Sequence, residues 1–202
     1  MPSHSAPAGQ GADRAAAANV LGAVALAVAD QISVAVTPPG ARSDSAAAAL
    51  SALYHFLDHP TVDRLCQVLG LTHSGGVRLL DRLEGAGLVE RGPGADGRSR
   101  SVRLTQAGRR AARRVSDRRI AYLTSLLAGL SAAEALALGD LLGRVMGQVV
   151  RHKEGGAWIC RMCELRACGR AAGNCPAANA AAVKYGMTPP GAGSMEPFIH
   201  TP

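Results

Sequence analysis

The sequence predicts a mainly α-helical protein that contains a winged helix-turn-helix, with a small β-hairpin as the wing. Hydrophobic residues make up 48% of the 202 residues and aromatic residues only 3%, a balance that favours helices over a β-sandwich or β-barrel. Two short helical patterns are joined by Gly70-Leu71, as in a helix-turn-helix. Two strand-like runs, 88–91 and 101–104, follow directly and enclose a turn-rich loop, which is a hairpin signal.

Two helices are expected before the helix-turn-helix. Residues 15–36 are apolar on nearly all sides and are followed by prolines, so we expect a helix that is buried against a partner chain. Apolar residues recur at helical spacing over 44–58, which predicts the second helix. Residues 1–14 are small and polar, with Pro and Gly, and are expected to be disordered.

No segment is expected to cross a membrane. The best apolar run, residues 15–29, is followed by Asp30, and a membrane span needs about 20 apolar residues. The same run is not interpreted as a signal peptide, because the one cation before it, Arg14, is offset by Asp13.

The helix-turn-helix is predicted over residues 62–86. Thr61 can cap a helix over 62–69, and Thr72 can cap a second helix that ends at about Ala86. Gly87 has the place of the glycine that follows a helix C-terminus. The apolar residues expected to face the core from the second helix are Leu79, Leu80, Leu83 and Ala86.

Two more helices are predicted after the hairpin. Thr105 can cap a helix that ends at about Ala128. Ser131 and Glu134 form a capping box that opens the sixth helix. The residues expected to form its core face are Leu138, Leu141, Leu142, Val145, Met146 and Val149.

The positive charge is concentrated in one block. The chain has a formal net charge of +7, and residues 61–119, with 13 arginines and six acidic residues, carry all of it. A localised basic block on a folded unit favours an anionic partner, nucleic acid first. In a winged helix the second helix enters the major groove, and the tip of the hairpin reaches the flanking backbone or minor groove.

This arrangement predicts the residues that contact DNA. The first turn of the second helix would meet phosphates or base edges. Arg78 is the candidate for reading a base, because Arg pairs bidentately with guanine. Arg98 and Arg100 flank the turn of the wing and would meet phosphate or enter the minor groove. The candidates on the second helix are Thr72, His73, Ser74, Gly75, Arg78 and Arg82.

These residues also carry a resemblance. The runs Leu79-Leu80-Asp81-Arg82-Leu83-Glu84, Gly87-Leu88-Val89-Glu90-Arg91, Asp96-Gly97-Arg98 and Leu104-Thr105-Gln106-Ala107-Gly108 resemble the MarR family of winged-helix transcription regulators. The resemblance covers about residues 15–152. It implies a homodimer whose terminal helices interlock, a palindromic operator in double-stranded DNA, and usually repression. It also places Asp96 in the wing, where it would orient a neighbouring Arg. Gly75 and Gly76 depart from the family and would each cost about 1 kcal/mol inside a helix.

The second informative segment is a cysteine cluster with the spacing C-x2-C-x4-C-x6-C. Four thiolates this close can converge on one structural zinc. Irregular spacing and a proline after the last cysteine are instead typical of iron–sulfur ligation. We therefore favour an iron–sulfur cluster over zinc as the bound group. A metal-free thiol–disulfide switch is a third interpretation. The candidate ligands are Cys160, Cys163, Cys168 and Cys175.

The cysteines lie in an extension over residues 153–185, followed by a flexible tail over 186–202. The extension follows the sixth helix, which in the family packs at the dimer interface, so a centre there would change the spacing of the two recognition helices. Trp158 is expected to pack over the cysteines and shield them from water. Cys66 stands apart and is expected to be a small core residue.

We therefore expect a cytoplasmic, dimeric DNA-binding regulator whose operator affinity depends on an iron–sulfur or zinc centre. An alternative is a small metal–thiolate electron carrier that uses the winged helix to dock to a protein. In a third interpretation the extension is structural, and a ligand bound between the wing domain and the dimer domain is the effector. The sequence contains no phosphate-binding loop, nucleophile elbow or paired catalytic carboxylates, so no enzyme activity is expected.

Overall fold

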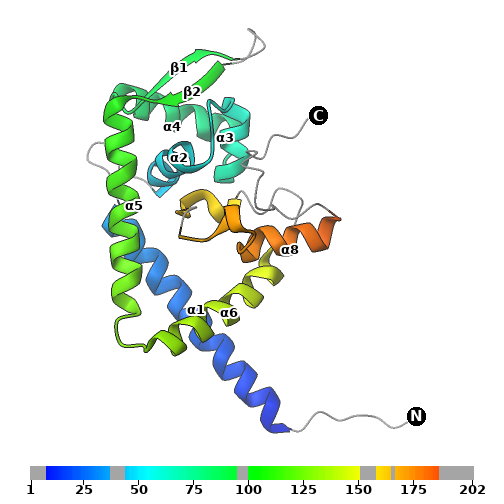
Figure 1. Cartoon of the computed structure of the whole chain (residues 1–202). Coiled ribbons are helices and arrows are strands. Elements are labelled where there is room, and N and C mark those ends of the chain that lie inside the picture. Colours follow the sequence, from blue (N-terminus) through cyan, green and yellow to red (C-terminus); the bar gives the residue numbers. More distant parts are fainter. Residues whose placement is uncertain (1–7, 37–43, 95–99, 151–157, 165–166, 187–202) are drawn as a thin grey trace.

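The computed structural model describes residues 8–36, 44–94, 100–150, 158–164 and 167–186 (Figure 1). Within these residues the chain is mainly helical and has one two-stranded antiparallel sheet, as the sequence predicts. In chain order the elements are α1 (Ala8–Val36), α2 (Asp44–His55), α3 (Val62–Leu69), α4 (His73–Gly85), β1 (Val89–Pro93), β2 (Arg100–Leu104), α5 (Gln106–Leu126), α6 (Ala132–Val149), the 3-10 turns η1 (Cys160–Met162) and η2 (Arg170–Ala172), and α8 (Pro176–Tyr185).

The main hydrophobic core lies where α2, α3 and α4 meet the hairpin. The buried faces of α4 are those predicted, with one exception. Ala86 is exposed because it is the C-cap of α4, where the chain turns away from the core. The largest core side chains, each 2% exposed or less, are Leu50, Leu65, Leu79, Leu80, Leu83 and Val102.

The hairpin confirms the predicted wing and extends beyond the predicted runs. β1 and β2 pair in register, with Val89 opposite Leu104 and Glu90 opposite Arg103. The wing is also tied to the start of α3, because the backbone N–H of Val102 donates to the carbonyl of Pro60 over 2.9 Å. These bonds join the wing and the helix-turn-helix into one unit.

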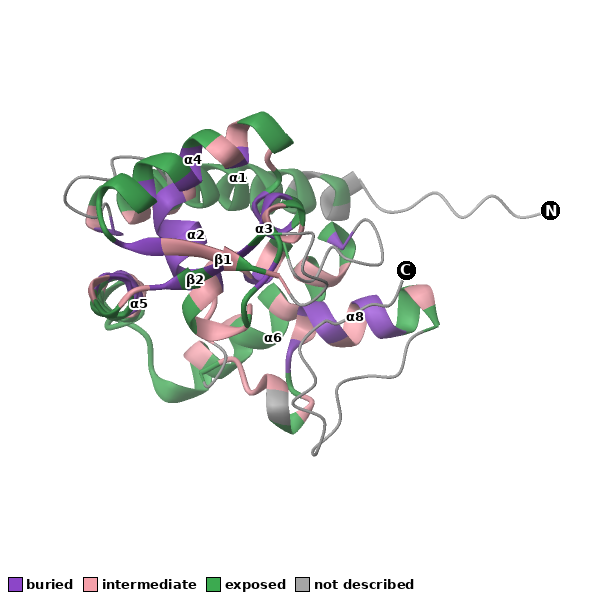
Figure 2. Ribbon diagram, turned by 90° about the horizontal axis from the view of Figure 1, so that it is seen from above, coloured by how far each residue is buried: buried purple, intermediate pink, exposed green. Residues whose placement is uncertain are grey.

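The long helix α5 leads from this unit to α6, and α1 packs against α5 (Figure 1). We call α1 and α6 the two arms. α1 begins at Ala8, so the prediction of disorder is wrong for residues 8–14, where no proline interrupts an alanine-rich segment. Among the residues of α1 whose burial is described, only Val36 is buried, and it packs with Ala47 of α2 and Val115 of α5. Most of α1 is exposed in the single chain (Figure 2).

α6 is also exposed, although the sequence predicted a core face. None of its residues is buried, and Leu141 is 55% exposed. The capping box of Ser131 and Glu134 is present as predicted. The predicted core face is therefore not buried within the single chain, where α8 packs against part of α6.

α1 is longer and more apolar than the run of residues 15–29 suggested. Its segment Asp13–Val36 has 24 residues and a mean hydropathy of 1.7, which by length and composition is enough to cross a membrane. The expectation that no segment reaches this length is therefore wrong. The core helix of a soluble protein and a signal sequence have the same length and composition, so this property alone is weak evidence for a membrane span.

The C-terminal extension contains a helix that the sequence reasoning missed. α8 begins with Pro176 at its first position and is followed by Gly186 in the left-handed conformation (φ 62°). Both are ordinary signals for the two ends of a helix. The extension lies between the winged-helix unit and α6, since η1 packs against α2 and α8 packs against α6.

Candidate nucleic-acid interface and cysteine cluster

The recognition helix α4 begins where Thr72 predicts. Thr72 has an extended backbone, and its hydroxyl accepts a hydrogen bond from the backbone N–H of Gly75 over 3.2 Å. Gly75 and Gly76 therefore lie in the first turn of the helix and not in its middle. A Cβ on Gly75 would lie 3.1 Å from the hydroxyl oxygen of Thr72, so this glycine leaves room for the cap.

Gly76 has a different neighbour. It is buried against α3, and a Cβ at this position would lie 2.1 Å from Sγ of Cys66. Cys66 is 5% exposed, which confirms the prediction that it is a core residue, and burial raises the pKa of its thiol. The glycine that departs from the family pattern therefore allows α3 and α4 to approach closely.

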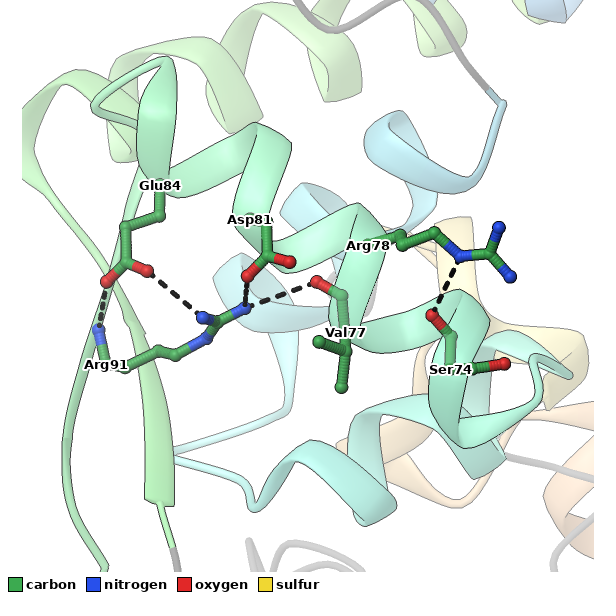
Figure 3. Close-up of polar contacts among 6 residues, drawn as sticks. All are labelled: Ser74, Val77, Arg78, Asp81, Glu84 and Arg91. Carbon is green, nitrogen blue, oxygen red and sulfur yellow. Dashed lines mark hydrogen bonds and ion pairs between the residues drawn. The ribbon is translucent and has the colours of Figure 1, made fainter.

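The polar face of α4 points away from this contact. Gly75 is half-buried, and the other predicted residues of α4 are exposed. Nε of Arg78 donates to the carbonyl of Ser74 over 3.3 Å, and the rest of its guanidinium extends away from the helix (Figure 3). The exposed residues of this face are Thr72, His73, Ser74, Arg78 and Arg82.

His73 has a partner that the sequence reasoning missed. Its Nδ1 lies 2.6 Å from Oδ1 of Asp63 on α3, and both side chains are exposed. The pair links the two helices of the helix-turn-helix at the outer surface. It places an imidazole ring at the N-terminus of α4.

Arg91 of β1 connects the wing to α4 (Figure 3). Its Nη2 donates to Oδ1 of Asp81 over 2.6 Å and to the carbonyl of Val77 over 3.3 Å, and its Nη1 pairs with Glu84 over 3.2 Å. Its side chain is only 20% exposed. Two acidic residues three apart on a helix, followed by an arginine in the next strand, were the available sequence signal. Arg91 positions the recognition helix and does not face outward with the other arginines.

The structure describes only one of the three wing residues that are predicted to contact DNA. Asp96 and Arg98 lie outside the described residues. Arg100, the first residue of β2, is exposed. On the same hairpin Arg103 pairs with Glu90 across the strands over 2.9 Å.

The four cysteines of the extension come together, as their spacing predicts. Cys160 and Cys175 are each 3% exposed, and Cys163 and Cys168 pack against them in one small core. We call these four residues the cysteine cluster. η1 supplies the first pair, since the backbone N–H of Cys163 donates to the carbonyl of Cys160 over 2.8 Å. Cys175 is the N-cap residue of α8.

The thiols of the cysteine cluster contact one another. Cys160 shares hydrogen bonds with Cys163 and with Cys175, and Cys168 shares one with Cys175. These contacts raise the pKa of Cys160, the donor, far above the ordinary value of a thiol. They lower the pKa of Cys163 to about 7 and that of Cys175 to about 5. Cys160 therefore holds its proton more tightly than its two neighbours, Cys163 and Cys175.

Positive groups from four elements lower the pKa values of Cys163 and Cys175. Backbone N–H groups at the start of α8 and the guanidinium of Arg170 also lower the pKa of Cys175. Arg119 of α5 and Arg161 of η1 act in the same direction on Cys163. Among the described residues, however, no group of three or more His, Cys, Asp or Glu side chains is arranged to hold a metal ion.

The indole of Trp158 lies against the turn between α3 and α4. It is 40% exposed, and a Cβ on Gly70 would lie 3.2 Å from its Nε1. Gly70 is the left-handed C-cap of α3 (φ 65°), in the turn of the helix-turn-helix. The guanidinium of Arg161 stacks over the indole ring, 4.6 Å from its centroid. The extension therefore touches the helix-turn-helix directly.

Comparisons with known proteins agree with this fold. Residues 42–99 match the family model of the MarR family. A MarR family protein from Bacillus stearothermophilus is 23% identical with a TM-score of 0.59, over 69% of this chain and 96% of that one. The YusO protein from Bacillus subtilis is 19% identical with a TM-score of 0.56, over 69% and 97%. The transcriptional regulator PA3341 is 23% identical with a TM-score of 0.53, over 65% and 96%.

No curated protein matches the sequence. The solved structures share the fold at low identity, and the family model matches the segment that contains α2, α3, α4 and β1. Members of this family are transcription regulators and not enzymes. Residues 42–99 are similar to the MarR family, and the solved structures show that the described chain shares their fold.

Proposed function

We propose that the protein is a cytoplasmic transcription repressor that binds a palindromic operator in double-stranded DNA as a homodimer. One observation carries the proposal: α4 is held by its buried apolar face and by Arg91, and presents an exposed face with Arg78 and Arg82. A helix with this anchoring can enter a major groove. The family match over residues 42–99 supports the same function.

The arms support the dimer. α1 and α6 expose large apolar side chains along their length, among them Leu26 at 70% and Leu141 at 55%. Contiguous exposed apolar surface of this kind marks an interaction site. A second copy of the chain would cover it, and a two-fold axis would place two α4 helices on one face for two half-sites.

Regulation by the cysteine cluster completes the proposal. η1 packs against α2, and Trp158 contacts the turn between α3 and α4. A change in the state of the thiols, whether by an iron–sulfur cluster, zinc or oxidation, would therefore reach the helix-turn-helix of the same subunit. This route differs from the one through the dimer interface that the sequence suggested.

The test is selection of binding sites from random double-stranded DNA, followed by affinity measurements on the selected sequence. We expect a palindromic site and affinity that falls steeply with salt, because phosphate contacts release counterions. Arg78→Ala should weaken binding about tenfold or more by loss of a base contact. Arg118→Ala, an exposed arginine on α5, is the matched control and should bind like the wild type. Absence of any selected site, with folded dimeric protein, would overturn the proposal.

A further inference from the structure

The thiols of the cysteine cluster form one row in which each contacts the next, in the order Cys163, Cys160, Cys175, Cys168. The inner two are almost fully buried. A thiol buried in apolar surroundings normally stays isolated and inert. Four of them in contact, from two separate turns and the start of a helix, are a built arrangement that the DNA-binding function does not use.

We propose that the cysteine cluster binds a single zinc ion through all four sulfurs. The proposal deepens the proposed function, on which its regulatory role rests, by naming what the thiols bind. Zinc bonds to sulfur are about 2.3 Å long and tetrahedral, which places the sulfurs about 3.8 Å apart. Sulfurs in hydrogen-bond contact are already close to this spacing.

The contacts favour one ion over the other two interpretations. An iron–sulfur cluster holds its cysteines at the outside of a body of several iron and sulfide atoms, so its ligands lie farther apart than thiols in mutual contact. A disulfide joins two sulfurs only. Cys160 has two thiol neighbours, Cys163 and Cys175, so the arrangement selects no single pair.

One of the two end cysteines in this row of four thiols must move before the four sulfurs can form a tetrahedron around zinc. Cys163 and Cys168 are the two ends of the row, and the described side chains are not yet arranged around a metal position. Cys168 precedes a loop with two left-handed glycines, Gly169 (φ 63°) and Gly173 (φ 74°). Asn179 of α8 anchors the far side of this loop, because its Nδ2 donates to the carbonyl of Gly173 over 2.7 Å. The loop therefore holds Cys168 beside Cys175.

Charge and protons balance in the binding step. Zinc forms four bonds to sulfur, and each thiol that still carries its proton releases it to solvent, with no change of oxidation state. The four thiolates and the ion together carry a charge of about −2. Arg119, Arg161 and Arg170 act on the cluster from three elements and offset this charge.

The experiment counts zinc, iron and sulfide in the full-length protein, purified without oxygen and without added metal. Cobalt then replaces the metal, because its visible spectrum reports four sulfur ligands. Cys168→Ser is the test variant, since this residue is only partly buried and its loss spares the inner pair. Cys66→Ser, outside the cluster, is the matched control. DNA affinity is measured on the same samples.

We expect one zinc per chain, a tetrathiolate cobalt spectrum, and a zinc affinity at least about 100-fold weaker in Cys168→Ser, with Cys66→Ser unchanged. Iron with sulfide, no bound metal, or unaltered affinity in Cys168→Ser would each overturn the proposal. Protein that holds zinc but binds no DNA would overturn the proposed function and leave the zinc site standing. Protein that binds DNA and no zinc would do the reverse.

Discussion

α4 and α6 are both helices with one apolar face, yet only α4 covers that face within its own chain. Leu79, Leu80 and Leu83 of α4 are buried under α2 and α3, whereas Leu141 and Leu142 of α6 are exposed by 55% and 44%. A helical repeat of apolar residues predicts that the apolar face of the helix packs against other apolar surface. It does not state whether the cover comes from the same chain or from another.

The largest effect should follow from opening the covered face. Leu80→Ala removes a fully buried side chain from α4 and should lower the free energy of unfolding by about 2–5 kcal/mol. Chemical denaturation followed by circular dichroism measures it. A loss below about 1 kcal/mol would mean that the core of the helix-turn-helix is not the unit that stabilises the chain.

The same substitution on the uncovered face should act on association. Leu141→Ala should leave the stability of a single chain nearly unchanged and weaken the dimer about 100-fold, because a two-fold interface loses the side chain twice. Analytical ultracentrifugation over a range of concentrations gives the dissociation constant. An unchanged dimer would show that α6 meets some other partner.

A smaller effect should follow where α3 and α4 touch. Gly76→Ala puts a methyl group against Sγ of Cys66 and should destabilise the fold by about 1–2 kcal/mol. Adding Cys66→Ala should recover most of the loss. Gly85→Ala, near the end of the same helix and with open space around it, is the matched control and should gain up to about 1 kcal/mol. Equal effects at Gly76 and Gly85 would show that the contact does not matter.

The smallest effect on stability should come from the contact between the extension and the helix-turn-helix. Trp158→Ala removes a half-exposed ring and should cost about 1 kcal/mol or less. The substitution should also change DNA binding. In the wild type, operator affinity should differ between protein with native cysteines and protein with altered cysteines, and in Trp158→Ala the ratio of these two affinities should fall towards one. Val183→Ala, at an 87% exposed site on α8, should keep the wild-type ratio. A preserved ratio in Trp158→Ala would leave the dimer interface as the route.

Local signals predicted most of the winged helix. Thr61, Thr72 and Thr105 cap the helices that their positions indicate, and each hydroxyl accepts a backbone hydrogen bond. Capping and turn chemistry act within a few residues, so one sequence is enough to find them. The convergence of the four cysteines was predictable for the same reason, because they lie close together in the chain.

Contacts between distant segments were not predictable in this way. The contact of Trp158 with Gly70 and that of Arg91 with Asp81 depend on how whole elements pack. The place of Gly76 against Cys66 depends on the crossing of two helices. The exposure of α6 depends on how the whole chain folds. Apart from the acidic pair that precedes Arg91, these contacts have no periodic or local signature in the sequence, so spacing alone did not predict them.

The ties between the wing and the recognition helix limit how the protein can respond to a signal. Arg91 joins β1 to α4, and Val102 joins β2 to Pro60, just before α3, so we expect the wing and the helix to move together. A signal that reaches this unit would rotate or shift it whole. In a dimer, such a change would alter which distance between two half-sites is accepted, while the preference for bases within each half-site stays the same.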